Sequence, residues 1–551
     1  MYVITTDQAI ADQVKRDYEK IYSEANIFQC ADVCVITACM EKGGAVRQFG
    51  ENTVFVFGTI FNTEYFNKEL LASYDHFEDF RTDLKGDTQI FFGHYVVILA
   101  SREAVEIIPD RVGLINTYYS QTENDGIVIS DDLLEVSRTS GNHELYAQAV
   151  YEFLLTESNI AKYTIFKNIF RLGFGKQIVF KNRKMMEQDI YHYVIEKLST
   201  EEYIAKVEKY FACFRHYKGR ITADLSAGYD TRTVCAIAHK MLPAFAGFTH
   251  ARNDDGGCDG QTSKIIAEKL HIPFYYVDYN EEREAADADY LEVLRETVVL
   301  RDAKRSQSWP ILFSKKYDDC ELALGGLGGE VFRGKYNTFK RIEDFIAVYY
   351  RGTEAEKVCG FEGYSENVQN ELKQYRLPSN MNRALFPNWY YAVAKMRIWG
   401  SGCIHHALLY GDVVHPMMDW YLLNPVFGFT AEEIQDAKLQ MRLIETFAPE
   451  LAGIPVNGMT TMKHASGSNP FKAYVSQWPK VRAIGTSLRC RRRNRKERTQ
   501  LAAPPNIPQE LMGAFAAETQ DILTGKGKSV ASRMQTILKA YDYVQREDII
   551  V

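Results

Sequence analysis

The sequence predicts an α/β protein in which a β-rich first part precedes a parallel sheet covered by helices. Over residues 1 to about 200, short runs of β-branched and aromatic residues are separated by turn residues, which is typical of layered β structure. From residue 221 to 278, strand-like and helix-like segments alternate at a regular pace. Such alternation indicates parallel strands joined by helical crossovers.

Length and composition narrow the class of protein. A chain of 551 residues is long enough for two domains and a C-terminal extension. A hydrophobic content of 46% and an aromatic content of 13% allow well-filled cores, which excludes global disorder. The formal net charge of -7 argues against a general nucleic-acid binder.

We expect a cytoplasmic protein. The opening Met-Tyr-Val-Ile-Thr-Thr-Asp lacks the basic and apolar regions of a signal peptide, and no apolar run approaches the roughly 18 residues of a membrane helix. The 10 Cys include no Cys-x-x-Cys pair, which disfavours zinc and thioredoxin-type sites. A reducing compartment fits a chain of this length, which needs no disulfides.

The elements of the first part follow from alternation and turn residues. A strand is predicted over residues 53–60 and a helix over residues 144–156. Two hairpins and a later turn and strand are predicted over residues 95–100 with 104–108, 114–120 with 126–130, and 169–180.

The strongest local pattern is a strand-like run, residues 221–225, that ends in a turn of small residues before a helix predicted over residues 234–241. The turn is Ser226-Ala227-Gly228. Free backbone N–H groups and the helix dipole make such a junction favourable for anions. A phosphate can approach the backbone at Ala227 and Gly228, where no bulky side chain intervenes.

Polar residues complete this junction. Ser226 and Thr231 supply hydroxyl donors, and Asp230 supplies a carboxylate for Mg²⁺ against the phosphates. Downstream, residues 244–249 and 273–278 read as strands and residues 259–270 as a helix. Because ligands bind beyond the carboxyl ends of parallel strands, Phe248, near the end of its predicted strand, is a candidate to lie beside a bound ligand.

A second glycine-rich stretch, residues 321–334, has a short strand, four Gly within five residues, and Glu330 at the start of a helix. Gly is costly in conformational entropy, so this density indicates that a ligand approaches the backbone closely. This second stretch is therefore expected to lie close to a ligand.

The first stretch resembles the pyrophosphate loop Ser-Gly-Gly-x-Asp-Ser of the ATP pyrophosphatase superfamily, in its asparagine synthetase branch; Ala227 and Thr231 replace a Gly and a Ser. The second resembles that branch's Ser-Gly-Glu-Gly-Ser-Asp-Glu-Leu-Phe-x-Gly-Tyr element, whose turn contacts nucleotide and whose Asp helps bind Mg²⁺. Two departures stand out: Gly329 replaces that Asp, and Leu327 falls where many relatives have a Glu or Tyr for the incoming amine.

The resemblance implies a set of ligand contacts. ATP would be bound by Leu225, Ser226, Ala227, Gly228, Asp230, Thr231, Phe248, Gly325 and Gly326. Mg²⁺ would be held by Asp230 and Glu330.

Residues outside the two turns are assigned on the same resemblance. Lys463, in a loop where the family carries a Lys, would neutralise pyrophosphate and the transition state, and Arg305 would hold phosphate or carboxylate. Asp419, in a run similar to the family's Pro-Phe-Leu-Asp, would orient a helix or loop. The general base stays open among Asp302, Asp318, Asp319 and the region of residues 397–474.

The first part resembles the glutaminase domain of class II amidotransferases. The motifs are a Gly and strand at residues 93–100, Asp-Arg-Val-Gly at 110–113, Ser-Asp-Asp at 130–132 and Arg-Leu-Gly-Phe-Gly at 171–175. That reaction uses an N-terminal Cys thiol, but position 2 is Tyr2. We therefore expect a scaffold or substrate-docking domain, as in β-lactam synthetases and lasso-peptide cyclases, two relatives of asparagine synthetase.

The expected organisation has three parts. Residues 1–195 form a degenerate, Ntn-like glutaminase domain, and residues 196–480 an adenine nucleotide α-hydrolase-like synthetase domain. Residues 481–551 hold a basic segment, 489–498, a candidate contact for an acidic partner, peptide or membrane surface, and two amphipathic helices over 509–545.

The resemblance implies an ATP- and Mg²⁺-dependent ligase that adenylates a carboxylate for attack by an amine, without glutamine hydrolysis. The product would be a macrocycle of lasso-peptide or β-lactam type, or the amide of a small acid or sugar acid. A non-catalytic nucleotide-binding scaffold or partner subunit is the alternative, because of Gly329 and Leu327.

Overall fold

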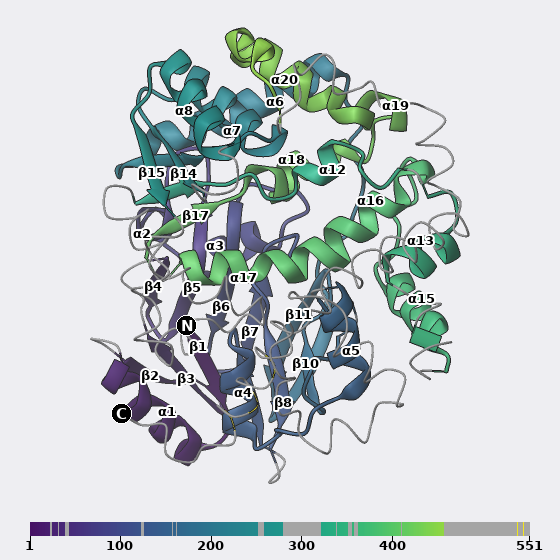
Figure 1. Cartoon of the computed structure of the whole chain (residues 1–551). Coiled ribbons are helices and arrows are strands. Elements are labelled where there is room, and N and C mark those ends of the chain that lie inside the picture. The colour runs from purple at the N-terminus through teal and green to yellow at the C-terminus, as the bar shows by residue number, and fades with distance from the viewer. Residues whose placement is uncertain are drawn as a thin grey trace.

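The computed structural model combines two antiparallel sheets with one parallel sheet (Figure 1). It describes residues 1–21, 25–30, 32–38, 43–122, 126–156, 158–160, 162–251, 258–278, 321–337, 339–350, 355–356, 362–408, 410–456, 537, 541 and 544. The antiparallel strands lie in the lower half of Figure 1, and the parallel strands with their helices lie above them.

The first antiparallel sheet has six strands in the order β10-β8-β9-β1-β3-β2. Their bounds are Tyr2–Thr5 (β1), Ala25–Cys30 (β2), Val33–Ala38 (β3), Tyr118–Gln121 (β8), Ile127–Ser130 (β9) and Ile169–Arg171 (β10). The predicted pairing of residues 114–120 with 126–130 is confirmed only from Tyr118 onward. The residues before it form a turn, because the Asp110 carboxylate accepts the N–H groups of Val112, Gly113 and Leu114.

The second antiparallel sheet also has six strands, in the order β12-β11-β7-β6-β5-β4. Their bounds are Gly44–Phe49 (β4), Asn52–Phe61 (β5), Phe92–Ala100 (β6), Val105–Pro109 (β7), Lys176–Lys181 (β11) and Lys184–Asp189 (β12). The predicted strand over 53–60 and the hairpin of 95–100 with 104–108 are confirmed as β5 and as β6 paired with β7.

Both faces of the inner strands β5, β6 and β7 are buried. In β5, Phe55 and Phe57 belong to the main core between the sheets, whereas Val54 and Val56 belong to a second core. Successive side chains of a strand point to opposite faces, which explains this division. Helices α2 (Asn67–Ala72) and α3 (Phe77–Lys85) contribute Leu70, Leu71, Phe77, Phe80 and Leu84 to the second core.

The third sheet is entirely parallel, as predicted, with the order β15-β14-β13-β16-β17. Its strands are Ile221–Asp224 (β13), Ala246–Ala251 (β14), Phe274–Asp278 (β15), Leu322–Leu324 (β16) and Asp412–Val414 (β17). The connection from β13 leads to β14 on one side, whereas β16 pairs with β13 on the other. The carboxyl end of β13 is therefore a topological switch point, where open parallel sheets bind ligands.

Two predictions for this sheet need correction. The helix after β13, α7 (Tyr229–Met241), begins at Tyr229 and not at Val234, because helical geometry starts directly after the extended Gly228. Phe248 does not lie near a strand end, since β14 continues to Ala251 and Phe248 is in register with Asp224. The predicted helix over 259–270 is confirmed as α8 (Cys258–Leu270).

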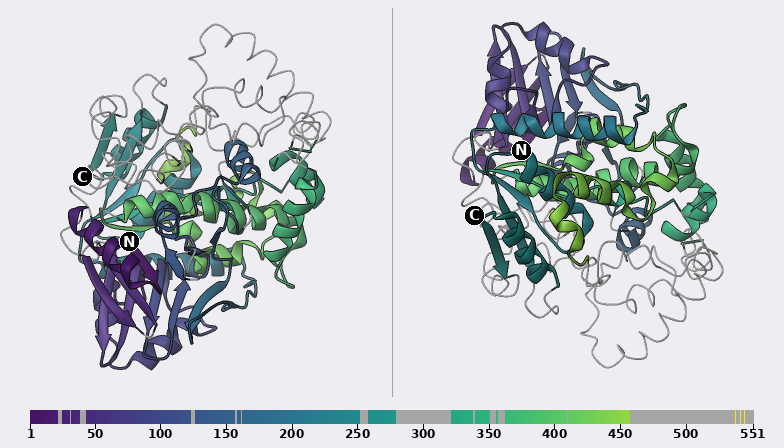
Figure 2. Two further views of the ribbon diagram at one scale, coloured as in Figure 1. Left: turned by 90° about the horizontal axis from the view of Figure 1, so that it is seen from below. Right: turned by 90° about the horizontal axis from the view of Figure 1, so that it is seen from above.

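Helices join the sheets into one body. Helix α17 (Arg397–Ala407) crosses the middle of Figure 1, between the antiparallel sheets and the parallel sheet. In both views of Figure 2 the purple and blue antiparallel strands stay on one side of the green helices. A single main core includes residues from both parts, such as Val3 of β1 and Val413 of β17.

The other helices complete the layers. They are α1 (Gln8–Ile21), α4 (Leu133–Ser140), α5 (Ala147–Thr156), α6 (Thr200–Cys213), α12 (Gly329–Phe332), α13 (Ile342–Tyr349), α15 (Tyr364–Gln374), α16 (Phe386–Tyr390), α18 (Trp420–Val426), α19 (Ala431–Ile434) and α20 (Lys438–Phe447). The predicted helix over 144–156 is α5, which begins at Ala147. Among the helices that the structure describes, none combines the length and the apolar character of a membrane span.

Several predicted features lie outside the described residues. They are Arg305, Lys463, the candidate bases Asp302, Asp318 and Asp319, the basic segment 489–498, and most of the helices predicted over 509–545.

Candidate functional site

The two glycine-rich turns meet at the carboxyl ends of the adjacent strands β13 and β16. A Cβ atom on Gly326 would lie 2.7 Å from the backbone nitrogen of Thr231, and one on Gly329 would lie 2.1 Å from Cγ of Asp230. Atoms at these distances, the backbone of Thr231 and the side chain of Asp230, leave no room for a Cβ, which explains Gly at both positions. The structure therefore brings Ser226, Thr231 and Asp230 together with Gly325, Gly326 and Glu330.

The first turn is held by short polar contacts. The hydroxyl groups of Ser226 and Thr231 lie 2.7 Å apart, and the N–H of Gly228 donates to Ser226 Oγ at 3.2 Å. The N–H of Ala227 donates to Oδ1 of Asp259, at the start of α8, at 2.9 Å. A carboxylate of the protein thus already accepts one of the N–H groups predicted to bind phosphate.

Arg232 supports the same turn from the protein interior. Its guanidinium is fully buried and donates to the carbonyl oxygens of Ala227 at 3.1 Å, Ile454 at 2.9 Å and Pro455 at 2.7 Å. Arg232 therefore links the turn to the chain that follows α20. Sequence reasoning did not select it, although it lies within the singled-out stretch.

Asp230 lies at the junction of the two turns, but its oxygens have protein partners. Arg333 Nη2 donates to Oδ2 at 2.9 Å, and Gln440 Nε2, from α20, donates to Oδ1 at 2.9 Å. Burial raises the pKa of Asp230 to about 6, and Arg333 opposes that rise. Glu330 adds to the rise, and the two carboxylates share Arg333, whose Nη2 lies 2.9 Å from Asp230 Oδ2 and 3.7 Å from Glu330 Oε1.

Cations surround the second acid. Glu330 Oε1 lies 3.7 Å from Arg333 Nη2 and 3.9 Å from Lys335 Nζ. Arg333 was missed from the sequence, although its position three residues after Glu330, across a helical turn, was a usable signal. No signal in the sequence could have identified Gln440, since it is 210 positions from Asp230 along the chain.

Leu327 and His415 form another edge of the site. The N–H of Leu327 donates to Nδ1 of His415, at the end of β17, at 3.4 Å, and the N–H of His415 donates to Nε2 of His94 at 3.0 Å. His94 belongs to β6, so the antiparallel part reaches the carboxyl end of the parallel sheet. Burial and the neighbouring His415 lower the pKa of His94 to about 3, which keeps its ring neutral.

The remaining predicted contacts are not at the junction. Leu225 and Phe248 are buried, and the N–H of Leu225 donates to the carbonyl of Phe248 at 2.8 Å. The Thr249 hydroxyl donates to the Leu225 carbonyl and lies 2.9 Å from the Ser263 hydroxyl. Leu225 and Phe248 thus belong to the buried structure that supports the first turn.

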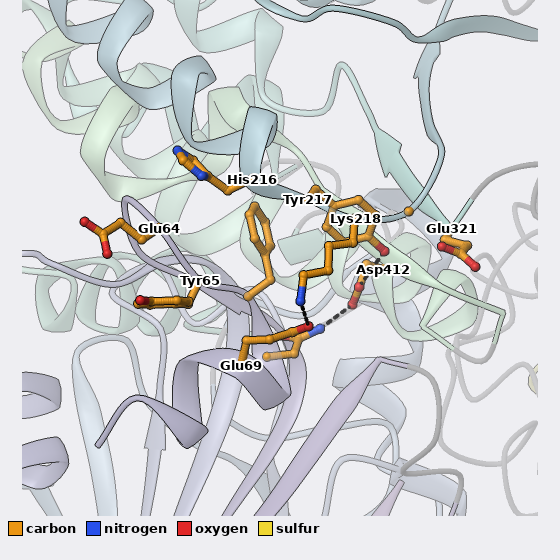
Figure 3. A pocket seen from close by; sticks show the side chains of 11 residues that line it. Glu64, Tyr65, Glu69, His216, Tyr217, Lys218, Glu321 and Asp412 are labelled. Atoms are coloured by element: carbon orange, nitrogen blue, oxygen red, sulfur yellow. Dashed lines mark hydrogen bonds and ion pairs between the residues drawn. The ribbon is translucent and has the colours of Figure 1, made fainter. Parts of the chain in front are cut away.

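A pocket of about 390 Å³ lies at the opposite end of the parallel sheet (Figure 3). Gly219 precedes β13, Glu321 precedes β16 and Asp412 begins β17, so this pocket is at the amino ends of the strands. Its acid Asp412 accepts from Asn67 at 2.8 Å, Tyr217 at 2.9 Å and Thr59 at 3.1 Å. Asp412 therefore joins the antiparallel and parallel parts, away from the glycine-rich turns.

Comparisons with known proteins add little to this geometry. No protein-family model and no curated protein matches the chain. A solved structure described as the allosteric regulatory enzyme of purine biosynthesis is similar at 9% identity and a TM-score of 0.24, over 41% of this chain and 60% of that one. Another, glutamine phosphoribosylpyrophosphate amidotransferase from B. subtilis complexed with ADP and GMP, is similar at 9% identity and a TM-score of 0.23, over 50% and 65%. The chain thus spans less than two thirds of either structure, and at these TM-scores no property of either enzyme is transferred to it.

Proposed function

We propose that this chain is an ATP-dependent carbon–nitrogen ligase that forms AMP and pyrophosphate. A substrate carboxylate attacks the α-phosphorus of ATP, and pyrophosphate leaves to give an acyl-adenylate. An amine then attacks the acyl carbon, loses a proton to a base, and displaces AMP to form an amide. The protein's tasks in this scheme are positioning and charge neutralisation.

The convergence of the two glycine-rich turns carries the proposal. Adjacent parallel strands, β13 and β16, end in turns whose backbones touch at a topological switch point. Gly and hydroxyl residues at that junction suit a phosphate chain, and Asp230 and Glu330 lie next to each other beside it, 2.9 Å and 3.7 Å from Arg333 Nη2. The predicted ATP contacts at 226–231 and 325–326 are thus compatible with a single bound nucleotide.

The donor set of the junction suits Mg²⁺. Asp230 and Glu330 are oxygen donors from the two turns, and Mg²⁺ takes one or two carboxylates together with phosphates and water. Within the described part of the chain no group of three or more His, Cys, Asp or Glu forms a metal cage, so phosphates and water would supply the other ligands. Mg²⁺, when bound, would neutralise charge on the phosphates.

Roles for the other residues follow from their contacts. Ser226 and Thr231 would donate to phosphate oxygens, and Arg232 would keep the turn in place through Ala227. Lys463 and Arg305 remain sequence-based candidates for charge neutralisation. The acid and amine stay open: a peptide or small molecule that closes on itself, or a small acid or sugar acid with ammonia or another amine.

ATP–pyrophosphate exchange tests this function. The wild-type protein, with Mg²⁺ and a panel of carboxylic acids and peptides, should exchange labelled pyrophosphate into ATP with at least one acid. Asp230→Asn should reduce exchange by about 10²-fold or more, since it removes a preorganised charge from the site. Asp75→Asn, at an exposed position away from the site, is the matched control. Undiminished exchange in Asp230→Asn would contradict the assignment.

A non-catalytic nucleotide-binding scaffold is the second candidate. It is favoured by the apolar Leu327, and by the occupation of both Asp230 oxygens and the Ala227 N–H by protein groups. Calorimetry separates the two: tight ATP binding without exchange for any acid favours the scaffold, whereas exchange with one acid favours the ligase.

A further inference from the structure

Arg333 links the two acids of the junction. It is the residue after α12, and its Nη2 lies 2.9 Å from Asp230 Oδ2 and 3.7 Å from Glu330 Oε1. A bond between a guanidinium and a carboxylate is among the stronger polar contacts, and it neutralises the carboxylate. In this arrangement Asp230 is not free to hold a metal ion.

The cluster also has unused polar atoms. Arg333 Nε is a buried donor and Gln440 Oε1 a buried acceptor, and among the described residues neither has a hydrogen-bond partner. Gln440 is itself fully buried. Buried polar atoms without a hydrogen-bond partner cost free energy, so these two atoms favour the binding of an additional ligand. An anionic oxygen would satisfy Arg333 Nε.

We propose that Arg333 is an exchangeable counter-ion of Asp230: Mg²⁺ takes its place on the carboxylate, and the released guanidinium binds a phosphate of the nucleotide. The inference rests on the proposed function. The planar guanidinium of Arg matches the oxygens of phosphate in a two-point geometry, as it matches carboxylate. The same side chain can therefore serve both partners in turn.

The charges of the cluster explain why metal and nucleotide would arrive together. Two acids, Asp230 and Glu330, face two cations, Arg333 and Lys335, so the formal charges cancel. A free divalent ion meets no net attraction there and must displace a bound guanidinium. A nucleotide supplies the anion that the displaced guanidinium then binds, which removes that cost.

Manganese binding without nucleotide tests the exchange directly. Electron paramagnetic resonance of free Mn²⁺ would be used to measure its affinity for wild type, Arg333→Met and Arg341→Met. Arg341 is exposed and pairs with Glu343 outside the site, so it is the matched control. Arg333→Met should bind Mn²⁺ at least about tenfold more tightly than wild type, because a unit positive charge next to the carboxylate is gone. Equal Mn²⁺ affinity in wild type and Arg333→Met would overturn the proposal.

Two further variants locate the effect and guard against misfolding. Arg333→Met with Asp230→Asn should lose the gained Mn²⁺ affinity, which assigns that affinity to Asp230; retention of the gain would overturn the proposal. Arg333→Lys retains the positive charge but lacks the planar guanidinium, so it should bind Mn²⁺ as weakly as wild type. Circular dichroism melting would show whether each variant is folded.

ATP binding separates this inference from the proposed function. Calorimetry should give weaker MgATP binding for Arg333→Met than for wild type, opposite in direction to the Mn²⁺ result. If wild type binds no ATP, the proposed function fails, and with it the phosphate half of the exchange, whereas the Mn²⁺ comparison still decides the counter-ion half. If wild type binds ATP and Arg333→Met binds it equally well, only the exchange is overturned.

Discussion

At the scale of single residues, the two departures from the asparagine synthetase pattern have structural causes. Gly329 is required because the Asp230 carboxyl group lies where its Cβ would be. Leu327 packs on helix α17 at Gly400, where an added Cβ would lie 2.5 Å from Leu327 Cδ2. Residue 327 is therefore part of the contact between the second turn and α17.

Gly329→Ala tests the close contact at the junction. The added methyl group must displace Asp230 and its partners Arg333 and Gln440, so the free energy of unfolding should fall by about 1–3 kcal/mol. Gly453→Ala is the control, because a Cβ there meets no atom within 4 Å. Denaturant unfolding of both variants measures the difference, and equal stability would show that Asp230 moves aside freely.

At the scale of elements, Asp419 connects a helix to a sheet. It caps α18 by accepting the N–H of Tyr421 at 2.9 Å, and it accepts the N–H of Gly93 in β6 at 2.6 Å and the hydroxyl of Tyr210 in α6 at 3.0 Å. The prediction that Asp419 orients a helix is confirmed by these contacts. Burial raises its pKa to about 6, while the hydrogen bonds oppose the rise.

Asp419→Ala should be more destabilising than the loss of a helix cap alone. It removes the cap and leaves the buried groups of Gly93 and Tyr210 unpaired, at about 1–3 kcal/mol each. Thr430→Ala, which removes the exposed cap of α19, should cost only about 1 kcal/mol. Thermal and denaturant unfolding measure both, and similar losses would mean that the contacts with β6 and α6 contribute nothing.

At the scale of the whole molecule, α17 ties the antiparallel part to the parallel part. His405 Nε2 lies 2.9 Å from Asp131 Oδ2, and both side chains are buried. Ser401 Oγ accepts the N–H of Asn116 at 3.1 Å, and Arg397 donates to the carbonyl of Leu172 at 2.8 Å. Since Leu327 packs on the same helix, the antiparallel part supports the second glycine-rich turn.

A double-mutant cycle measures the Asp131–His405 pair. Asp131→Asn and His405→Gln should each cost about 3 kcal/mol or more, because each leaves a buried partner unpaired. The double variant should lose about 1–3 kcal/mol less than the sum of the two. Strict additivity would mean that the two residues act independently.

The same pair has a pH signature. Burial raises the pKa of Asp131, but the amino group of the chain and His405 lower it by more, to about 2. Because this value is below the ordinary 3.8, the contribution of Asp131 to stability is present above pH 3.8 and is lost as the pH falls toward 2. When the free energy of unfolding is measured against pH for the same variants, Asp131→Asn should not show this loss of stability in acid.

Local sequence patterns were sufficient for most elements and for the two turns. Strands such as β5 and β6 are runs of β-branched and aromatic residues, and the two turns contain small residues and acids that are visible in the sequence. Patterns failed where a side-chain hydrogen bond or the register of a strand decides the structure. The residues before Tyr118 look strand-like but form a turn around the Asp110 carboxylate, and the register of β14 places Phe248 beside Asp224, behind the turn.

The sequence by itself determined that two turns of small and polar residues follow strands and that an acid stands in each. These properties depend on residues adjacent in the chain. Only the tertiary structure decided what those acids contact, because Arg333 and Gln440 are 103 and 210 positions from Asp230. The charge available to a metal or a phosphate is a sum over such distant neighbours, so it is set by the packing of the chain around the junction.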